Sequence, residues 1–161
     1  MIADLLDGHV PTTVLVGIGP GSFTGLRVAI AAAHGLAIGW GVAVVGMPSL
    51  ALLAASVPGD GPVAAALTGG HGELFVQAFD RAPFAAIGDL LNLTPADAAQ
   101  AIATDHVVGS GAAALVAARG HGEAIELDPS AQFALSLPLA LRSLQASPLY
   151  VREPDARPKA A

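Results

Sequence analysis

Short apolar runs separated by glycine and proline breaks make up the first part of the chain. Residues 12–17 are β-branched and apolar and lie between Pro11 and a glycine loop, which predicts a buried strand. Within residues 24–39, Leu26, Ile30, Ala33 and Ala37 recur at helical spacing, and the other faces are small and mostly uncharged. This pattern predicts a long helix that is covered on more than one side.

The pattern of apolar runs and breaks also predicts strands and helices in the rest of the sequence. Residues 42–45 predict a short strand, followed by a helix from 48 to 56 and a break at 58–61. Residues 63–67 and 73–79 flank a glycine-rich turn, a spacing that predicts an antiparallel hairpin. Thr94, followed by Pro95 and Asp97, has the residues of a helix start, so a helix is expected to about residue 103. Further expected elements are a helix end at 2–6, strands at 106–109 and 124–127, a helix at 112–119, and a helix that begins at 128–129 and is interrupted near 138.

Length, charge and cysteine content exclude several classes of protein for this chain. The chain has 161 residues, only 12% of them charged, with a net charge of −6 and no cysteine. This length predicts one domain or two small lobes that share a core. An acidic chain without a basic stripe is not expected to hold nucleic acid by itself, and the lack of cysteine excludes a disulfide framework or a thiolate nucleophile. The first seven residues hold two acids and no Lys or Arg, so they do not resemble a signal peptide, and a cytoplasmic location is expected.

A membrane span is the alternative that the long uncharged stretch between Arg27 and Asp60 raises, because roughly 20 apolar residues cross a bilayer. Several glycines and Pro48 divide this stretch into helix, strand and helix, and neither end has a cluster of basic residues. We therefore expect no membrane insertion.

The glycine-rich run after the first predicted strand is the strongest local signal. It lies at a strand-to-helix junction, where glycines permit positive φ and free amides point toward an anion. The alternative is a tight turn that packs a small-residue helix onto a sheet. The run lacks the Lys-Ser/Thr end of a Walker loop, the dinucleotide-binding spacing, and the glycines that flank a nucleophilic serine. The candidate residues are Gly19, Pro20, Gly21, Ser22, Thr24, Gly25 and Arg27.

Catalytic and metal chemistry has little support in the remaining residues. The five histidines are scattered, and none pair at the helical spacing that binds a metal on one face. Four acids, Asp60, Glu73, Asp80 and Asp89, lie in predicted turns or the hairpin, where charged residues are usually solvated. No metal site and no catalytic residue are predicted.

Several segments together resemble a known family. Residues 19–27 read Gly-Pro-Gly-Ser-Phe-Thr-Gly-Leu-Arg, and residues 34–37 and 45–50 continue the pattern with His-Gly-Leu-Ala and Val-Gly-Met-Pro-Ser-Leu. Residues 72–75, Gly-Glu-Leu-Phe, and residues 148–156, from Pro to Ala around Tyr-Val-Arg, add two later features. The sequence resembles the TsaB (YeaZ) family over essentially its whole length.

The resemblance implies an α/β, actin-like (ASKHA, ribonuclease H-like) fold of two lobes. In this family the first lobe opens with a strand, a hairpin and most of a helix, so a first lobe that is shortened at its N-terminus is expected here. The implied boundaries are residues 1–57 for the rest of the first lobe, 58–151 for the second lobe and 152–161 for a polar tail. At 68–71 the sequence reads Thr-Gly-Gly-His, where relatives usually have Asp-Ala-Arg.

The resemblance also implies a function. Members of the family are non-catalytic dimerisation subunits in the threonylcarbamoylation of the tRNA adenosine 3′ of the anticodon. The implied partners are the paralogue TsaD, TsaE through the complex of this chain with TsaD, a second copy of the chain, and tRNA only through the complex. No cofactor is expected, and nucleotide would bind only in or with the complex.

A first-lobe helical surface is the hypothesis for the partner interface, with Leu5, Ala31, His34, Gly35 and Ile38 as its residues. Small uncharged side chains suit close contact between helices, although the same faces could fill the protein's own core. The competing class of function is an ASKHA-type kinase or phosphohydrolase that uses the loop from Gly19 to Gly25 on a nucleotide phosphate.

Overall fold

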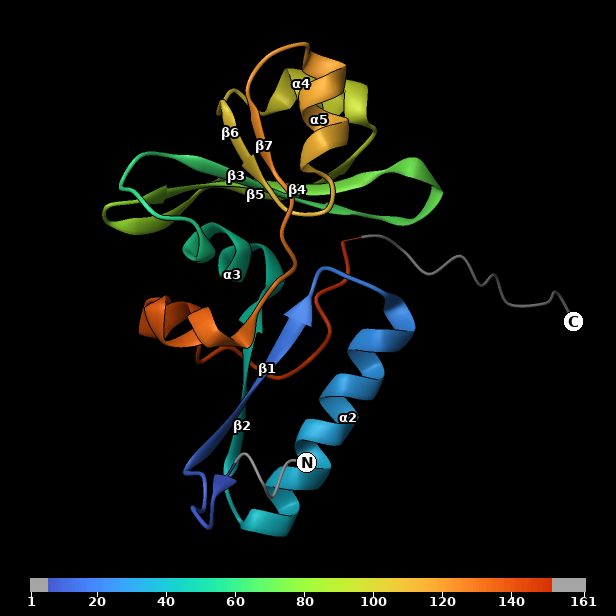
Figure 1. Cartoon of the computed structure of the whole chain (residues 1–161). Helices are drawn as coiled ribbons and strands as arrows, with labels where there is room; N and C mark the ends of the chain where they lie inside the picture. The colour runs from blue at the N-terminus through green and yellow to red at the C-terminus, as the bar shows by residue number, and fades with distance from the viewer. Residues whose placement is uncertain (1–5, 152–161) are drawn as a thin grey trace, which may run out of the picture.

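The protein folds into a five-stranded sheet and a two-stranded sheet with helices on their faces (Figure 1). The structure is a computed structural model and describes residues 6–151. The fold is mixed α/β, as expected for the actin-like class.

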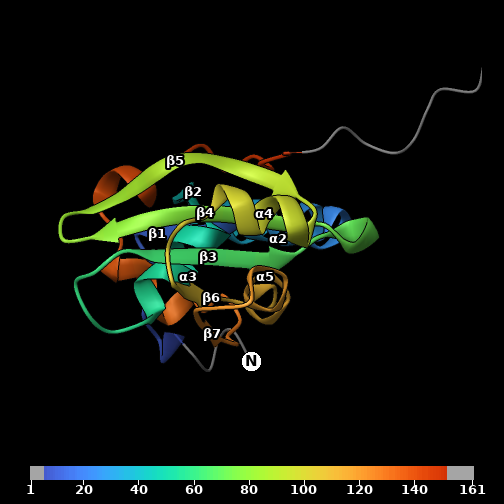
Figure 2. The same ribbon diagram turned by 90° about the horizontal axis from the view of Figure 1, so that it is seen from above.

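The larger sheet has the strand order β5-β4-β3-β6-β7, seen side by side in Figure 2. Strands β3 (Val63–Thr68), β4 (Leu74–Arg81) and β5 (Phe84–Leu93) pair antiparallel, whereas β6 (His106–Val108) and β7 (Glu123–Ile125) extend the sheet in parallel. One face carries α4 (Pro95–Ala101) and α5 (Ala112–Arg119), and α3 (Ser49–Ser56) covers the other (Figure 1). Because both faces are covered, β3 is buried from Val63 to Leu67.

The smaller sheet contains the parallel strands β1 (Thr13–Gly19) and β2 (Ala43–Pro48). Helix α2 (Phe23–Trp40) connects them and packs Ile30 and Ala33 against Val16 and Ile18 of β1. Both strands end beside α3, so α2 and α3 begin at the carboxyl end of the same sheet (Figure 1).

The C-terminal part of the described chain returns to this smaller sheet. It passes two short 3-10 helices, η2 (Ala131–Ser136) and η3 (Leu139–Leu141). Leu144 then forms an antiparallel bridge with Gly46, and the Leu149 amide donates to the Ile18 carbonyl at 2.7 Å. The last described segment therefore holds the two strands of the smaller sheet, which lie far earlier in the chain.

Most of the predicted elements are confirmed. The strand at β1, the helix-strand-helix division of the uncharged stretch, and the antiparallel pair of β3 and β4 are present. Thr94 caps α4 as predicted, because its side chain accepts a hydrogen bond from the Asp97 amide. The helix end expected at 2–6 lies mostly outside the described residues.

Three expectations differ from the structure. Strand β5 was not predicted, because its sequence lacks regular alternation and contains Gly88 at φ 73°. The helix expected from 128–129 is replaced by η2 and η3, since Leu137 precedes Pro138 and adopts the extended conformation that a following proline favours. The prediction that α2 is covered on more than one side is wrong for this chain, because Val28 is 64% exposed and Ile38 is 82% exposed.

Candidate functional site

The glycine-rich loop forms a compact turn between β1 and α2. Gly19 has φ 111°, and a Cβ there would lie 2.9 Å from Leu26 Cδ1 and 3.3 Å from the Leu149 carbonyl oxygen. Ser22 is the N-cap of α2, where its Oγ accepts a hydrogen bond from the Gly25 amide at 3.3 Å. The turn therefore depends on glycine at position 19, and Ser22 serves as a helix cap.

Arg27 joins an aromatic pair near the start of α2. Its Nε donates a hydrogen bond to the Tyr150 hydroxyl at 2.8 Å, and its guanidinium carbon lies 3.7 Å from the centre of the Phe23 ring. The Phe23 and Tyr150 rings are 5.4 Å apart between centres. This cluster, which we name the Arg27 clamp, connects the first turn of α2 to the C-terminal segment.

A pocket of about 340 Å³ lies beside the loop and opens to solvent. The loop contributes Pro20, Gly21, Ser22 and Gly25 to it, whereas Gly19, Thr24 and Arg27 do not line it. The other lining residues come from α2, α3, β3 and the segment after β7: Leu26, Ser49, Leu67, Thr68 and Pro129. Of these lining residues, only those of the loop were predicted as candidate site residues from the sequence. The position of Ser49 could have indicated a site, because it follows the second parallel strand and ligands often bind where such strands end.

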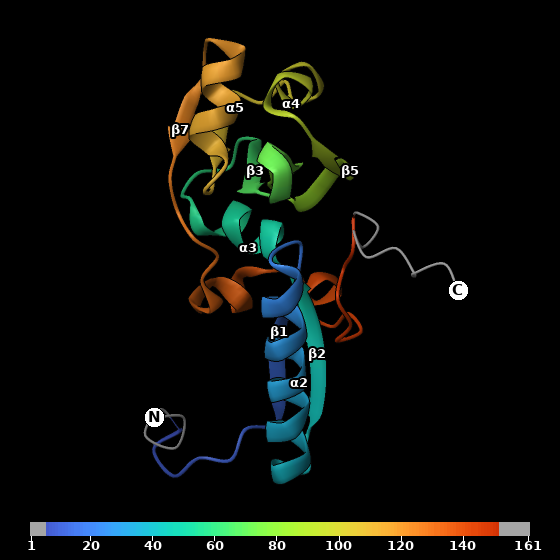
Figure 3. The ribbon, with the colours of Figure 1, turned by 90° about the vertical axis from the view of Figure 1, so that its right-hand side faces the viewer.

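The exposed side of α2 carries the other candidate residues (Figure 3). Ala31, His34, Gly35 and Ile38 are spaced at i, i+3, i+4 and i+7, so they form one stripe on the helix. All four are exposed, and a Cβ on Gly35 would meet nothing within 4 Å. Leu5, the remaining candidate, lies outside the described residues.

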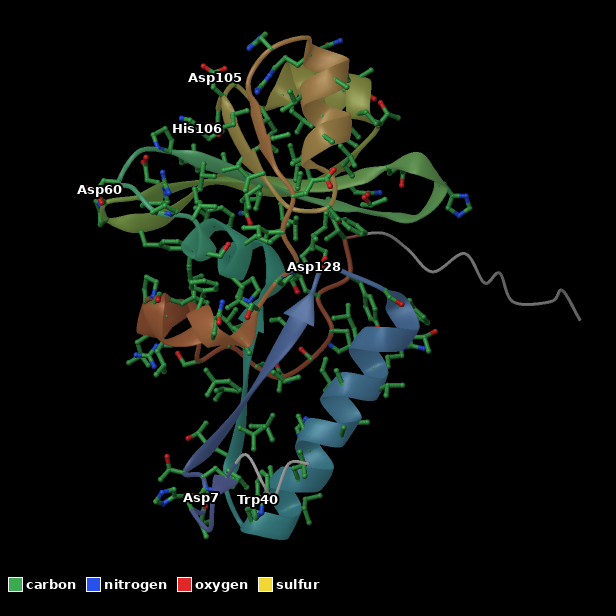
Figure 4. The ribbon with its side chains drawn as sticks, viewed as in Figure 1. Asp7, Trp40, Asp60, Asp105, His106 and Asp128 are labelled. Atoms are coloured by element: carbon green, nitrogen blue, oxygen red, sulfur yellow. The ribbon has the colours of Figure 1, made fainter. Side chains whose placement is uncertain are left out.

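Residues 6–151 contain no cluster of three or more His, Asp or Glu side chains that could bind a metal ion. Two exposed histidine–carboxylate hydrogen bonds, His106 with Glu123 and His121 with Asp105, connect β6 and β7 and the loops beside them. Figure 4 shows Asp105 and His106 well apart from Asp128, the neighbour of Pro129 in the pocket wall.

Comparisons with known proteins agree with this architecture. A family model described as "TsaD: tRNA N6-adenosine threonylcarbamoyltransferase" matches residues 11–104, which is more than half of the chain. The chain belongs to the TsaD family. A comparison with curated proteins gave no significant match.

Two solved structures are similar over nearly the whole chain. One is an uncharacterized protein with similarity to peptidase YEAZ from Pseudomonas aeruginosa, with 28% identity and a TM-score of 0.76 over 94% of this chain and 81% of that one. The other is YeaZ from Pseudomonas aeruginosa, with 26% identity and a TM-score of 0.74 over 92% and 81% of the two chains. Within the tRNA modification family, these neighbours identify the chain as a TsaB (YeaZ) member with an actin-like fold.

Proposed function

We propose that this TsaD-family chain is a non-catalytic dimerisation subunit that binds the paralogue TsaD in the threonylcarbamoylation of tRNA. The exposed stripe of α2 is the observation that carries the proposal. Ile38 is 82% exposed and Val28 is 64% exposed on a helix that has no acidic residue in its first turn and no basic residue in its last. Apolar side chains exposed along one stripe of a helix are typical of a surface that another protein covers.

The shape of this stripe suits a helical partner. Gly35 and Ala31 add almost no side-chain volume, so the backbone of a second helix can approach closely at the centre. Val28 and Ile38 lie near the two ends of the stripe, where their side chains would fit into grooves of the partner. The same geometry would also serve a second copy of this chain when TsaD is absent.

The roles of the loop residues support a subunit without its own chemistry. The Ser22 hydroxyl caps α2, and the Arg27 side chain is engaged by Tyr150 and Phe23. In this proposal TsaE joins through the complex with TsaD, and tRNA is bound by the complex as a whole. A role as a nucleotide-dependent enzyme is the alternative, and it predicts that ATP with Mg²⁺ raises the melting temperature of the chain alone.

Helix α2 raises a third alternative, because by length and composition it could cross a membrane. It is the one such helix within the described part of the chain, and length and composition alone are weak evidence. A membrane-embedded chain would be insoluble without detergent, whereas a TsaD-binding subunit would elute as a defined heterodimer.

The test is light scattering after size exclusion on the chain alone and mixed with TsaD from the same organism. We expect a heterodimer with the unaltered chain and its loss with His34→Glu or Ile38→Asp, because each places a charge in the apolar stripe. Ala117→Asp on the exposed side of α5 is the matched control and should leave the heterodimer intact. If both α2 variants still bind TsaD as the control does, the interface is elsewhere.

A further inference from the structure

Four arginines lie in the described part of the chain, and one of them differs from the others. The guanidinium groups of Arg81 and Arg119 each donate to several backbone carbonyl oxygens. Arg27 belongs to the clamp described above, where its Nε donates to the Tyr150 hydroxyl. The Nε of Arg142, in contrast, is buried and has no hydrogen-bond partner.

The charge of Arg142 is also uncompensated. In the part of the chain that the structure describes, the ion pairs join carboxylates to His106 and His121, and none involves Arg142. A charged donor that is removed from water without an acceptor destabilises the folded protein, and hydrogen bonds between charged groups are among the strongest in proteins. The Arg142 guanidinium would therefore gain more from a bound carboxylate than the other three arginines would.

Arg142 follows the short helix η3 directly and lies near two exposed leucines. Its backbone amide donates to the Leu139 carbonyl at 3.1 Å, which closes one 3-10 turn. Side chains three residues apart leave such a turn on the same side, so Leu139 and Arg142 are neighbours. Leu139 is 68% exposed, and Leu135 of the preceding helix η2 is 75% exposed. We name Leu135, Leu139 and Arg142 the η surface.

The two leucines are not needed to attach this segment to the rest of the protein. Ala134 and Leu137 already do so, because both are buried in the core cluster around α3. Leu135 and Leu139 point away from that cluster, as their exposure shows. Large apolar side chains that gather on an exposed surface are typical of a site that another protein covers.

The η surface is separate from the exposed stripe of α2. Figure 1 shows the orange segment with η2 and η3 on the opposite side of β1 and β2 from α2. The two segments also pack into different clusters, since η2 joins the cluster around α3 and α2 joins the core of the smaller sheet. A partner on the η surface would leave α2 accessible to TsaD, so the inference does not rest on the proposed function.

We propose that the η surface binds an acidic segment of a partner protein, in which one Asp or Glu carboxylate pairs with Arg142 and adjacent apolar side chains cover Leu135 and Leu139. Charge complementarity favours this occupant, because one guanidinium matches one carboxylate through two parallel hydrogen bonds. Arg142 is partly exposed, and no acceptor holds its Nε in place, so the side chain can turn outward to the carboxylate. A nucleic acid fits less well, since a chain with a net charge of −6 repels phosphates.

The test is NMR of the arginine Nε–H groups in the full chain during titration with a defined peptide. The peptide is acetylated, amidated and reads Ser-Leu-Leu-Glu-Leu-Ser. We expect the Arg142 Nε–H signal to shift and saturate, because it gains a charged acceptor, whereas the Arg81 signal should stay, since that Nε already donates to the Gly61 carbonyl. The same peptide with glutamine in place of glutamate should bind about tenfold or more weakly.

Two variants of the chain distinguish binding from a structural role of Arg142. Arg142→Met should abolish saturable binding and leave the urea midpoint equal or higher, because an apolar side chain replaces a buried donor without a partner. A structural arginine would instead lower the midpoint when it is replaced. Leu139→Ala should weaken peptide binding severalfold. Val10→Ala is the matched control: it shortens another exposed apolar side chain, which is 70% exposed, and should leave peptide affinity unchanged.

Saturable binding that depends on the glutamate of the peptide and on Arg142 supports the proposal. Absence of a saturable shift, equal binding of the glutamine peptide, or equal binding by Arg142→Met overturns it. Oligouridine that shifts the Arg142 signal at lower concentration than the peptide also overturns it, in favour of a nucleic-acid site. The comparison of the two peptides uses the unaltered chain, so it decides the question even where a variant does not fold.

Discussion

Gly46 shows how a single residue fixes the packing of distant segments. Its backbone bonds Leu144 in both directions, at 2.7 and 3.1 Å, and a Cβ would lie 2.5 Å from Ile18 Cγ2 and 2.8 Å from the Gln145 carbonyl oxygen. We expect Gly46→Ala to lower the free energy of unfolding by about 1–3 kcal/mol, because strand and segment must move apart. Gly39→Ala is the control, since a Cβ there meets nothing within 4 Å, and urea unfolding should show it neutral or slightly stabilising. Equal effects of the two changes would contradict this account.

The Arg27 clamp leads to a second prediction at the scale of residues. Arg27→Ala removes the bond to Tyr150 and the contact with Phe23, so the segment that includes Leu149 should open more often. A cation–π contact at an exposed site contributes about 0.5–1 kcal/mol, so exchange of the Leu149 amide should be about twofold to fivefold faster. Hydrogen exchange followed by NMR measures this rate, with the amide of Gly120, the C-cap of α5, as an internal control that should not change. An unchanged Leu149 rate would show that the clamp does not hold the segment.

Helix α4 is an element whose start the sequence specifies locally. The Thr94 hydroxyl donates to the Asp97 carboxylate at 2.7 Å and accepts from the Asp97 amide at 3.2 Å. Thr94→Ala should lower the free energy of unfolding by about 1 kcal/mol, because a first-turn amide loses its acceptor. Thr94→Ser retains both bonds and should unfold in urea at nearly the original midpoint. A serine variant as unstable as the alanine variant would assign the effect to the lost methyl group.

Local signals of this kind explain which elements could be predicted. Thr94 and Pro95 mark a helix start, and the glycine loop marks the junction of β1 with α2. Strand β5 could not be predicted because its formation depends on pairing with β4, from Leu74 opposite Leu93 to Arg81 opposite Phe84. The helix expected after residue 128 does not form because Leu137, which precedes Pro138, is extended, and the residues before it form only the 3-10 helix η2.

Only the part of the pocket that the glycine-rich loop forms could be predicted from the sequence. The glycine loop could be recognised from its composition. The pocket wall formed by Ser49, Thr68 and Pro129, however, comes from three other segments. Their approach depends on how α3 packs between the larger sheet and η2, which is a property of the tertiary fold. The burial of Ser49 is likewise not evident from the sequence, where a serine at a helix start looks ordinary.

At the scale of the whole molecule, the first strand, β1, and the last described segment both belong to the smaller sheet. Leu144 and Ala146 pack against the core of Val16, Ile18, Ile30 and Ala33. The larger sheet has a separate cluster under α4 and α5, and its other cluster, around α3, includes Met47 of β2. A two-stranded sheet has little independent stability, so the returning segment contributes a substantial part of what holds β1 and β2 together. The two sheets should therefore respond differently to loss of that segment.

A chain that ends at Arg142 tests this directly. It lacks the bridge between Leu144 and Gly46 and the bond from Leu149 to Ile18, but it retains every strand of the larger sheet. We expect amide exchange in β1 and β2 to rise toward that of an unfolded chain, because the apolar cover of their core is lost. Amides of β3 and β4 should keep most of their protection, since the cores on both faces of that sheet remain. Mass-resolved hydrogen exchange of both chains measures this contrast, and uniform loss of protection across the two sheets would show that they unfold as one cooperative unit.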